Sequence, residues 1–203
     1  MASWIALEGG EGSGKSTQAR LLADALDAVL TREPGGTPIG SRVRALLLDP
    51  EIEDLDPRAE ALLMAADRAQ HVAEVVGPAL LAGLVVVSDR SAWSSLAYQG
   101  YGRRLPIDEL WRLSDFALRT RWPDLAVLID VPPIVAVRRV ARRGGADRLD
   151  LEDRHFHARV RSGFAALMAR WPDRWVAVDG TGTEEEVAAR VLGAVHGRIA
   201  LDG

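Results

Sequence analysis

The sequence contains no cysteine and no asparagine, and it has a single lysine against 24 arginines among its 203 residues. The absence of cysteine excludes disulfide bonds, cysteine-ligated metal sites and thiol nucleophiles. No apolar run approaches the roughly 20 residues that span a bilayer, so no membrane partner is expected. An apolar strand is predicted within a few residues of the N-terminus, which leaves no room for a signal peptide. We therefore expect a cytoplasmic protein.

An excess of positive charge is also lacking, because 25 Lys and Arg residues stand against 29 Asp and Glu residues, for a formal net charge of −4 at neutral pH. This balance argues against a surface whose main task is nucleic-acid binding. Hydrophobic residues make up 48% of the chain, which is enough for a sizeable core. A chain of 203 residues fits one compact domain. We therefore predict a single domain over residues 1–203.

The only lysine, Lys15, lies in the stretch GGEGSGKST at residues 9–17. Arginine is the cation everywhere else, so a position that keeps lysine needs a compact ammonium on a slim, flexible stem. The pattern G-x-x-x-x-G-K-[ST] begins at Gly9 and ends at Ser16. A predicted strand precedes it and a predicted helix follows it, which is the context that a phosphate-binding loop requires. The sequence therefore predicts a nucleoside-triphosphate site here.

In such a loop, backbone N–H groups converge on phosphate oxygens, and the N-terminus of the next helix favours negative charge. We expect Lys15 to reach the β- and γ-phosphates of ATP, and the Ser16 hydroxyl to hold Mg²⁺. The predicted ATP-binding residues of the loop are Gly9, Gly10, Glu11, Gly12, Ser13, Gly14, Lys15, Ser16 and Thr17.

Short apolar stretches alternate with helical patterns along the whole chain. The predicted strands lie within residues 3–10, 28–34, 84–90, 124–131 and 174–180. The predicted helices lie within residues 16–26, 38–49, 57–83 (with a kink at Gly77-Pro78), 91–100, 107–120, 133–143, 153–170 and 183–195. Near-continuous apolar strands separated by helices predict the α/β class, with a five-stranded parallel sheet covered on both faces. Ligands then bind beyond the carboxyl ends of the strands.

Two further motifs follow predicted strands at that same edge. TREPGGT, at residues 31–37, is either a plain strand-to-helix loop or part of the site. Asp89 and Arg90 emerge from the most apolar strand, either as a buried ion pair that caps the next helix or as functional charges. The basic stretch 138–150 is either a solvated helix end, where arginines suit the helix dipole, or a mobile segment that closes over a ligand.

Together with AYQG at residues 97–100, these motifs resemble bacterial thymidylate kinase. They occur in that family's order and spacing from residue 4 to about residue 190. The resemblance implies a P-loop NTPase fold of the nucleoside-monophosphate-kinase type, with a mobile lid at about 142–152. It further implies transfer of the γ-phosphoryl group of ATP to dTMP, Mg²⁺ as cofactor, and a homodimer.

The resemblance also implies roles for single residues. Arg44 and Arg90 hold the dTMP phosphate, and Asp89 holds water of the Mg²⁺ shell beside Ser16. Arg68 donates to the O4 carbonyl of thymine. The implied dTMP-binding residues are Glu11, Glu33, Pro34, Arg44, Met64, Arg68, Arg90, Ser95, Tyr98 and Gln99. Met64 stands where the family usually has a phenylalanine that stacks on thymine, so base selectivity depends on how methionine covers the ring.

The lid is expected to supply the remaining positive charge. Arg139 is expected to lie against adenine, with residues 179–183 along the adenine edge. Arg148, helped by Arg142 or Arg143, is expected to swing in when the lid closes and to stabilise charge on the transferring phosphoryl group. The predicted catalytic residues are Lys15, Asp89, Arg90, Arg143 and Arg148, and the predicted metal ligands are Ser16 and Asp89.

Two alternative functions remain open from the sequence. The first is another P-loop kinase, acting on dUMP, CMP or a non-nucleotide acceptor. The second is a nucleotide-binding switch without transferase activity. A GTPase switch normally reads guanine with an Asn-Lys-x-Asp motif, and this chain has no asparagine. The four histidines show no metal-ligand spacing and are expected to be structural or exposed.

Overall fold

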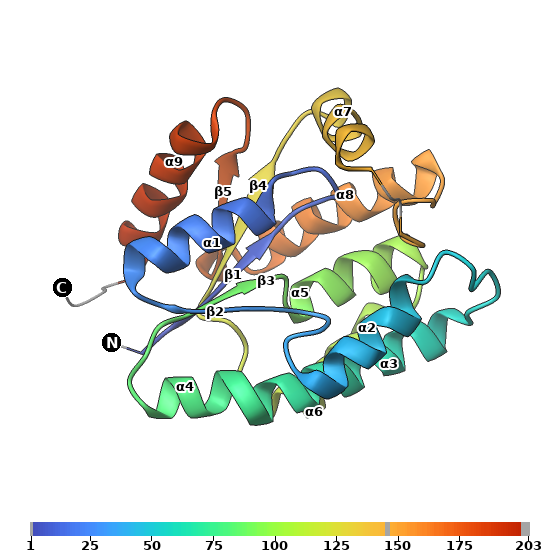
Figure 1. The fold of residues 1–203 in the computed structure, drawn as a ribbon. Helices are drawn as coiled ribbons and strands as arrows, with labels where there is room; N and C mark the ends of the chain where they lie inside the picture. The colour runs from blue at the N-terminus through green and yellow to red at the C-terminus, as the bar shows by residue number, and fades with distance from the viewer. Residues whose placement is uncertain (1, 145–146, 200–203) are drawn as a thin grey trace.

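The computed structural model describes residues 2–144 and 147–199 of the chain. In this part of the chain, five parallel strands form one sheet in the order β2-β3-β1-β4-β5 (Figure 1). The strands are β1 (Trp4–Glu8), β2 (Val29–Arg32), β3 (Val86–Asp89), β4 (Leu125–Asp130) and β5 (Trp175–Asp179). The predicted five-stranded parallel sheet is confirmed.

Strand β1 lies at the centre of the sheet, hydrogen-bonded to β3 on one side and to β4 on the other. All of its residues are buried. Successive side chains point to opposite faces of a strand, so Trp4 joins the core on one face, while Ile5 and Leu7 join the core on the other. A strand packed on both faces and both edges is a rigid support for the loop that follows it.

The helices cover both faces of the sheet (Figure 1). Helices α1 (Lys15–Leu26) and α9 (Glu184–His196) pack on the face that carries Ile5. The other face is covered by α2 (Pro38–Leu48), α3 (Pro57–His71), α4 (Gly77–Leu81), α5 (Ala92–Ser95), α6 (Ile107–Leu118) and α8 (Arg154–Arg170). Helix α7 (Pro133–Arg143) follows β4. Within the described residues, no helix is both long and apolar enough to cross a membrane.

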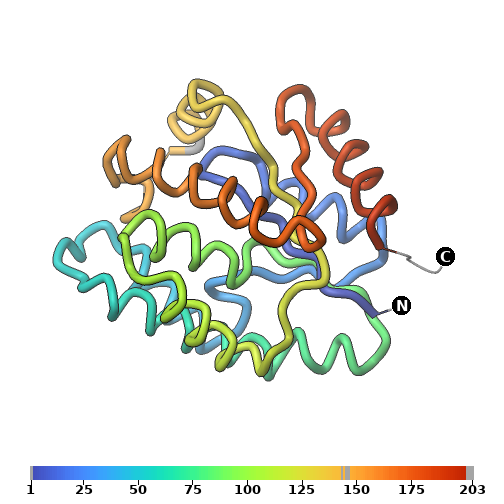
Figure 2. The backbone as a smooth tube through the Cα atoms, turned by 180° about the vertical axis from the view of Figure 1, so that it is seen from behind, coloured from blue at the N-terminus to red at the C-terminus, as the bar shows by residue number. Residues whose placement is uncertain are grey.

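Two of the predicted helices are interrupted by π-helical segments. The helix predicted over 57–83 consists of α3, the π-helical segment Val72–Val76 and α4. Gly77 N–H donates back to the Val72 carbonyl. Such a wide turn makes room for Pro78, whose ring otherwise clashes with a carbonyl four residues back. A second π-helical segment, Leu96–Gly102, continues α5 and packs beside α8 (Figure 2).

A cluster of tryptophans joins several of these helices. The Trp111 ring stacks on Trp122 at 4.1 Å and on Trp171 at 4.7 Å between ring centroids. Trp93, which is fully buried, contacts the rings of all three and also that of Trp175. Because Trp93 belongs to α5, this cluster holds the short helix that follows β3 at the carboxyl edge of the sheet.

Candidate active site

The loop between β1 and α1 folds so that the Lys15 side chain reaches back across the backbone of the loop. Gly12 has φ 72° in the left-handed region, and a β-carbon there would meet the Ala136 carbonyl at 2.4 Å. The Lys15 Nζ donates to the Gly10 carbonyl at 3.2 Å and lies 3.7 Å from the Glu11 carboxylate. Burial, and then the nearby charge of Arg90, lower the pKa of Lys15. The ammonium is thus partly desolvated and aimed across the loop.

Ser16, at the start of α1, meets Asp89, at the end of β3. The Ser16 hydroxyl donates to one oxygen of the Asp89 carboxylate. The other oxygen, Oδ1, is buried and has no hydrogen-bond partner among the described residues. Strands β1 and β3 are neighbours in the sheet, and Leu7 of β1 lies opposite Asp89 of β3. The pairing of these strands therefore brings Asp89 beside the phosphate loop that follows β1 and ends at Ser16.

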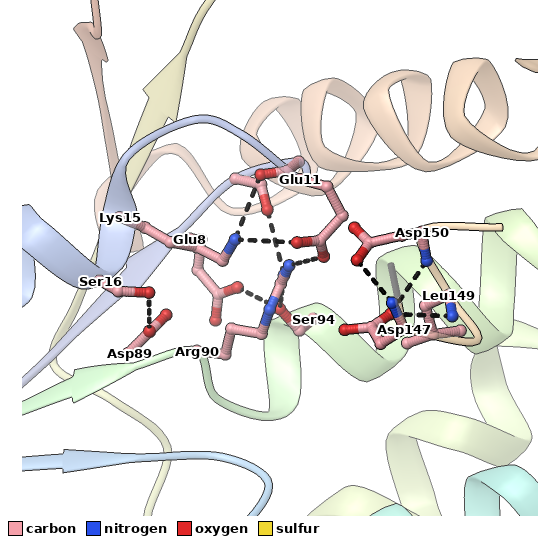
Figure 3. A network of polar contacts seen from close by, with 12 residues as sticks. Glu8, Glu11, Lys15, Ser16, Asp89, Arg90, Ser94, Asp147, Leu149 and Asp150 are labelled. Atoms are coloured by element: carbon pink, nitrogen blue, oxygen red, sulfur yellow. Dashed lines mark hydrogen bonds and ion pairs between the residues drawn. The ribbon is translucent and has the colours of Figure 1, made fainter. Parts of the chain in front are cut away.

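Arg90, the next residue, has its guanidinium held from two sides (Figure 3). Its Nη1 donates to the Gly9 carbonyl at 3.1 Å and to the Ser94 hydroxyl at 2.9 Å. Its Nη2 donates to the Glu11 carboxylate and to the Tyr98 hydroxyl. Tyr98 in turn donates to Glu11 at 3.0 Å. The phosphate loop and the α5 region are therefore joined through Arg90.

At the other end of the site, Arg68 of α3 is locked by a buried chain of polar contacts. Its Nε donates to Glu33 at 2.8 Å, and its Nη2 donates to Ser95 at 2.9 Å. The second oxygen of Glu33 lies 2.9 Å from His71 Nδ1, and His71 Nε2 lies 2.7 Å from the Thr31 hydroxyl. Glu33, Arg68 and His71 are each at most 3% exposed. The guanidinium therefore has a defined direction.

Arginines also gather between these two ends. Arg44 of α2 donates to the Pro34 carbonyl at 3.0 Å. Burial, and then the charge of Arg32, lower the pKa of Arg44. Two guanidinium groups that repel each other beside a cavity form a binding site for an anion, whose charge removes the repulsion.

One cavity of about 550 Å³ unites these parts. At the end away from α3, Arg139 of α7 donates to the Ser13 carbonyl and to the Gly180 carbonyl, both at 3.1 Å. The sequence-predicted residues that line the cavity are Glu11, Gly12, Ser13, Gly14, Lys15, Ser16, Thr17, Glu33, Pro34, Arg44, Met64, Arg68, Asp89, Arg90, Ser95, Tyr98, Gln99 and Arg139. Gly9 and Gly10 belong to the same loop and contact Arg90 and Lys15 through their carbonyls.

Comparison with known proteins now decides the family. The thymidylate kinase family model matches residues 7–191. The chain belongs to the thymidylate kinase family. It is 41% identical to a thymidylate kinase of Exiguobacterium, over 98% of this chain and 97% of that protein. It is 46% identical to one of Deinococcus radiodurans, over 96% and 97%. The crystal structure of thymidylate kinase from Ehrlichia chaffeensis matches with TM-score 0.79 at 30% identity, covering 96% of this chain and 98% of the other.

Arg148, which is expected to reach the phosphoryl group when the lid closes, lies outside the cavity lining in this structure. Arg148 is 8% exposed, its Nε donates to the Leu47 carbonyl at 2.9 Å, and its Nη2 contacts Glu60 at 2.6 Å. Moving Arg148 away would break the hydrogen bonds of its Nε and Nη2 and leave the buried Glu60 carboxylate with less compensation, which is costly. The side chain of Arg143 and residues 145–146 of the expected lid lie outside the described residues.

Three buried residues that contact residues of the site from behind have no role in the sequence analysis. Glu8 accepts hydrogen bonds from Ser91 and Ser94 beneath the phosphate loop. His71 supports Glu33. Glu60, which is fully buried, accepts hydrogen bonds from Gln99, Arg103 and Arg148. One sequence signal could have identified Glu8 and Glu60, because each is a carboxylate at a position where the surrounding pattern predicts a buried face.

Proposed function

We propose that this protein transfers the γ-phosphoryl group of ATP to dTMP, giving ADP and dTDP. The observation that carries this proposal is the single cavity that joins Lys15 of the phosphate loop to the locked Arg68, with Arg44 and Arg90 between them. The acceptor is a phosphate oxygen that is ionised at neutral pH, so no general base is needed. Catalysis then consists of holding two anions in line and neutralising their charge.

Each part of the cavity has a task in this reaction. The loop N–H groups and Lys15 hold the β- and γ-phosphates of ATP. Arg44 and Arg90 hold the dTMP phosphate, because an arginine fork matches phosphate oxygens in pairs. Glu11 and Tyr98 both contact Arg90, so in this proposal they lie beside the bound phosphate of dTMP. The deoxyribose of dTMP, which is attached to that phosphate, then lies next to these two side chains.

Arg68 is proposed to recognise the base. Its Nε and one Nη are committed to Glu33 and Ser95, so the remaining donors of the fork point in a fixed direction. A fixed donor suits the O4 carbonyl of thymine and opposes the amino group that cytosine carries there. This arrangement supports dTMP over CMP as the acceptor.

Mg²⁺ is the proposed cofactor, and the residues present fit it. Magnesium prefers oxygen ligands and is usually held by one or two carboxylates together with waters and substrate phosphates. Ser16 and Asp89 supply a hydroxyl and a carboxylate at one point, and Asp89 Oδ1 lacks a protein partner among the described residues. When bound, Mg²⁺ neutralises charge on the phosphates of ATP.

An assay of ATP consumption tests the proposal against both alternatives. We expect consumption that depends on dTMP, with dTDP as the product, and at least about tenfold lower kcat/KM with CMP or dUMP. Consumption at the same rate without any acceptor would indicate a nucleotide switch. A preference for CMP, dUMP or a non-nucleotide acceptor would show that Arg68 recognises a group other than the O4 carbonyl of thymine.

Met64 prompts a prediction about the acceptor. It lines the cavity from α3, at 9% exposure, one helical turn before Arg68. We expect Met64→Phe to lower the KM for dTMP roughly 2- to 10-fold, since an aromatic pair contributes about 0.5–1.5 kcal/mol beyond its area. The KM for ATP, measured in the same preparation, is the internal control. An unchanged or raised KM for dTMP would show that Met64 does not face the base.

A homodimer is the second part of the proposal. Phe116 on α6 is 85% exposed and Leu62 on α3 is 59% exposed, and these two helices pack side by side. Large exposed apolar side chains on neighbouring helices are typical of an interface. The proposed dimer buries this pair against a second copy of the chain.

We expect Phe116→Glu to convert the dimer to a monomer, as measured by light scattering on a size-exclusion column. Leu81 on α4 is equally exposed, at 85%, and lies at a different place in the fold. Leu81→Glu is therefore the matched control and should remain dimeric. The interface assignment is wrong if Leu81→Glu dissociates the dimer and Phe116→Glu does not.

Four sequence-based predictions are carried forward with this function. A cytoplasmic location is supported by the substrates, which are nucleotides kept inside the cell, and by the absence of cysteine. The single domain over 1–203 and the lid at 142–152 stay predictions. So does a contribution of Arg143 to catalysis.

A further inference from the structure

Glu8 is a carboxylate in an unusual place, at the end of the central strand and directly before the phosphate loop. It is fully buried. Burying a charge is costly unless hydrogen bonds compensate it. Glu8 accepts one hydrogen bond from Ser91 at 2.7 Å and one from Ser94 at 2.5 Å. Burial raises the pKa of Glu8 to about 7, although both hydrogen bonds oppose that rise. A buried carboxylate that costs this much free energy is expected to have a specific role.

Ser94 connects Glu8 to Arg90 (Figure 3). A serine hydroxyl has one hydrogen to donate and lone pairs to accept with. The Ser94 hydroxyl donates its hydrogen to Glu8, so only lone pairs remain for the other side. That side receives the Nη1 of Arg90 at 2.9 Å. Glu8 therefore determines which way the Ser94 hydroxyl points, and makes it an acceptor for Arg90.

The backbone of Arg90 shows that its position is imposed by its surroundings. Its φ of 71° lies in the left-handed region, which is costly for a residue with a side chain. The Nη2 contacts go to the side chains of Glu11 and Tyr98, which line the cavity. The Nη1 contacts go to Ser94 and to the Gly9 carbonyl. Ser94 lines the cavity too, but its hydroxyl is held from behind by Glu8, which does not, so the Nη1 contacts anchor the guanidinium to a group outside the cavity.

We propose that Glu8 is a positioning residue for phosphoryl transfer, which acts through Ser94 to hold the Arg90 guanidinium in the direction of the acceptor phosphate. This inference rests on the proposed function, because it needs Arg90 to bind the phosphate of dTMP. Glu8 itself is not among the residues that line the cavity, and its two hydrogen-bond partners are the hydroxyls of Ser91 and Ser94.

Binding of dTMP and of ATP, each measured by calorimetry, tests the proposal. We expect Ser94→Ala to weaken dTMP binding about 10-fold, the size of one lost hydrogen bond to a charged group. ATP binding should stay within about 2-fold. Ser91→Ala is the matched control, because the Ser91 hydroxyl also donates to Glu8 and caps α5, whereas the hydrogen bonds of the Arg90 guanidinium within the described residues go to other groups. It should lower thermal stability and leave dTMP binding within about 2-fold.

A double-mutant cycle with Arg90→Met distinguishes a failure of the positioning role of Glu8 from a failure of the proposed role of Arg90 in binding dTMP. Arg90→Met should weaken dTMP binding, and Ser94→Ala should then add nothing further. Glu8→Gln provides a second cycle, because its effect should vanish in the same background. If Arg90→Met leaves dTMP binding unchanged, the proposed role of Arg90 fails. The positioning role is overturned if Arg90→Met weakens dTMP binding while Ser94→Ala and Glu8→Gln have no effect on it. It is also overturned if the effects of Ser94→Ala and Glu8→Gln are as large in the Arg90→Met background as in the parent.

Discussion

Replacing Lys15 with arginine lowers kcat at least about 100-fold, the range seen when one electrostatic donor to a transition state is lost. Arginine is the usual cation of this chain, so the loss cannot be ascribed to charge. The Lys15 Nζ lies 3.2 Å from the Gly10 carbonyl, on a side chain that is 8% exposed. A planar fork is wider than an ammonium and cannot occupy the same place without moving the loop. Steady-state kinetics with saturating ATP and dTMP measures the effect.

The matched control for Lys15 is the reverse exchange on the same helix. The Arg20 side chain is 55% exposed and pairs with Asp24 one turn along α1. Arg20→Lys should leave kcat and the melting temperature unchanged, because a surface pair of this kind contributes little. Turnover of Lys15→Arg within a few-fold of the parent would show that the loop needs a positive charge and not a lysine.

Arg148→Ala lowers the free energy of unfolding by about 3 kcal/mol, near the lower end for removing one partner of a buried ion pair. Glu60 would remain buried and would keep Arg103 at 3.0 Å and Gln99 at 2.7 Å, which limits the loss. The Leu47 carbonyl loses its donor as well. Urea denaturation followed by circular dichroism measures the change.

Arg161→Ala is the control for Arg148. Arg161 pairs with Asp130 at 3.1 Å, and both side chains are about half exposed. Its removal should cost at most about 1 kcal/mol. The catalytic role that the sequence suggests for Arg148 makes the opposite prediction. It would be supported by unchanged stability together with a loss of at least about 100-fold in kcat.

Local patterns in the sequence were sufficient for the sheet and for the phosphate loop. Strands such as β1 and β4 are continuous apolar runs because helices cover both faces, and their order along the chain alternates with helices. Lys15 and Ser16 were identified because their spacing is set by the loop itself. Asp89 could be placed near them because parallel strands end at the same edge.

The contacts that the sequence did not reveal join residues far apart in the chain. Glu8 meets serines 83 and 86 positions later, and Arg148 meets Leu47 and Glu60, 101 and 88 positions earlier. No local pattern encodes such a pairing. The π-helical segments escaped prediction for a related reason, since a single extra residue in a turn leaves the apolar pattern nearly unchanged.

The stacked tryptophans have an optical consequence. Indole rings at 4.1 and 4.7 Å, as between Trp111 and its neighbours Trp122 and Trp171, are close enough for their electronic transitions to couple. Coupled chromophores in one fixed geometry produce strong circular dichroism bands that vanish when the packing loosens, even where helices persist. Trp93 extends the array into α5, two residues before Ser95 of the cavity. The near-ultraviolet spectrum of this protein therefore reports directly on whether the region that follows β3 is in place.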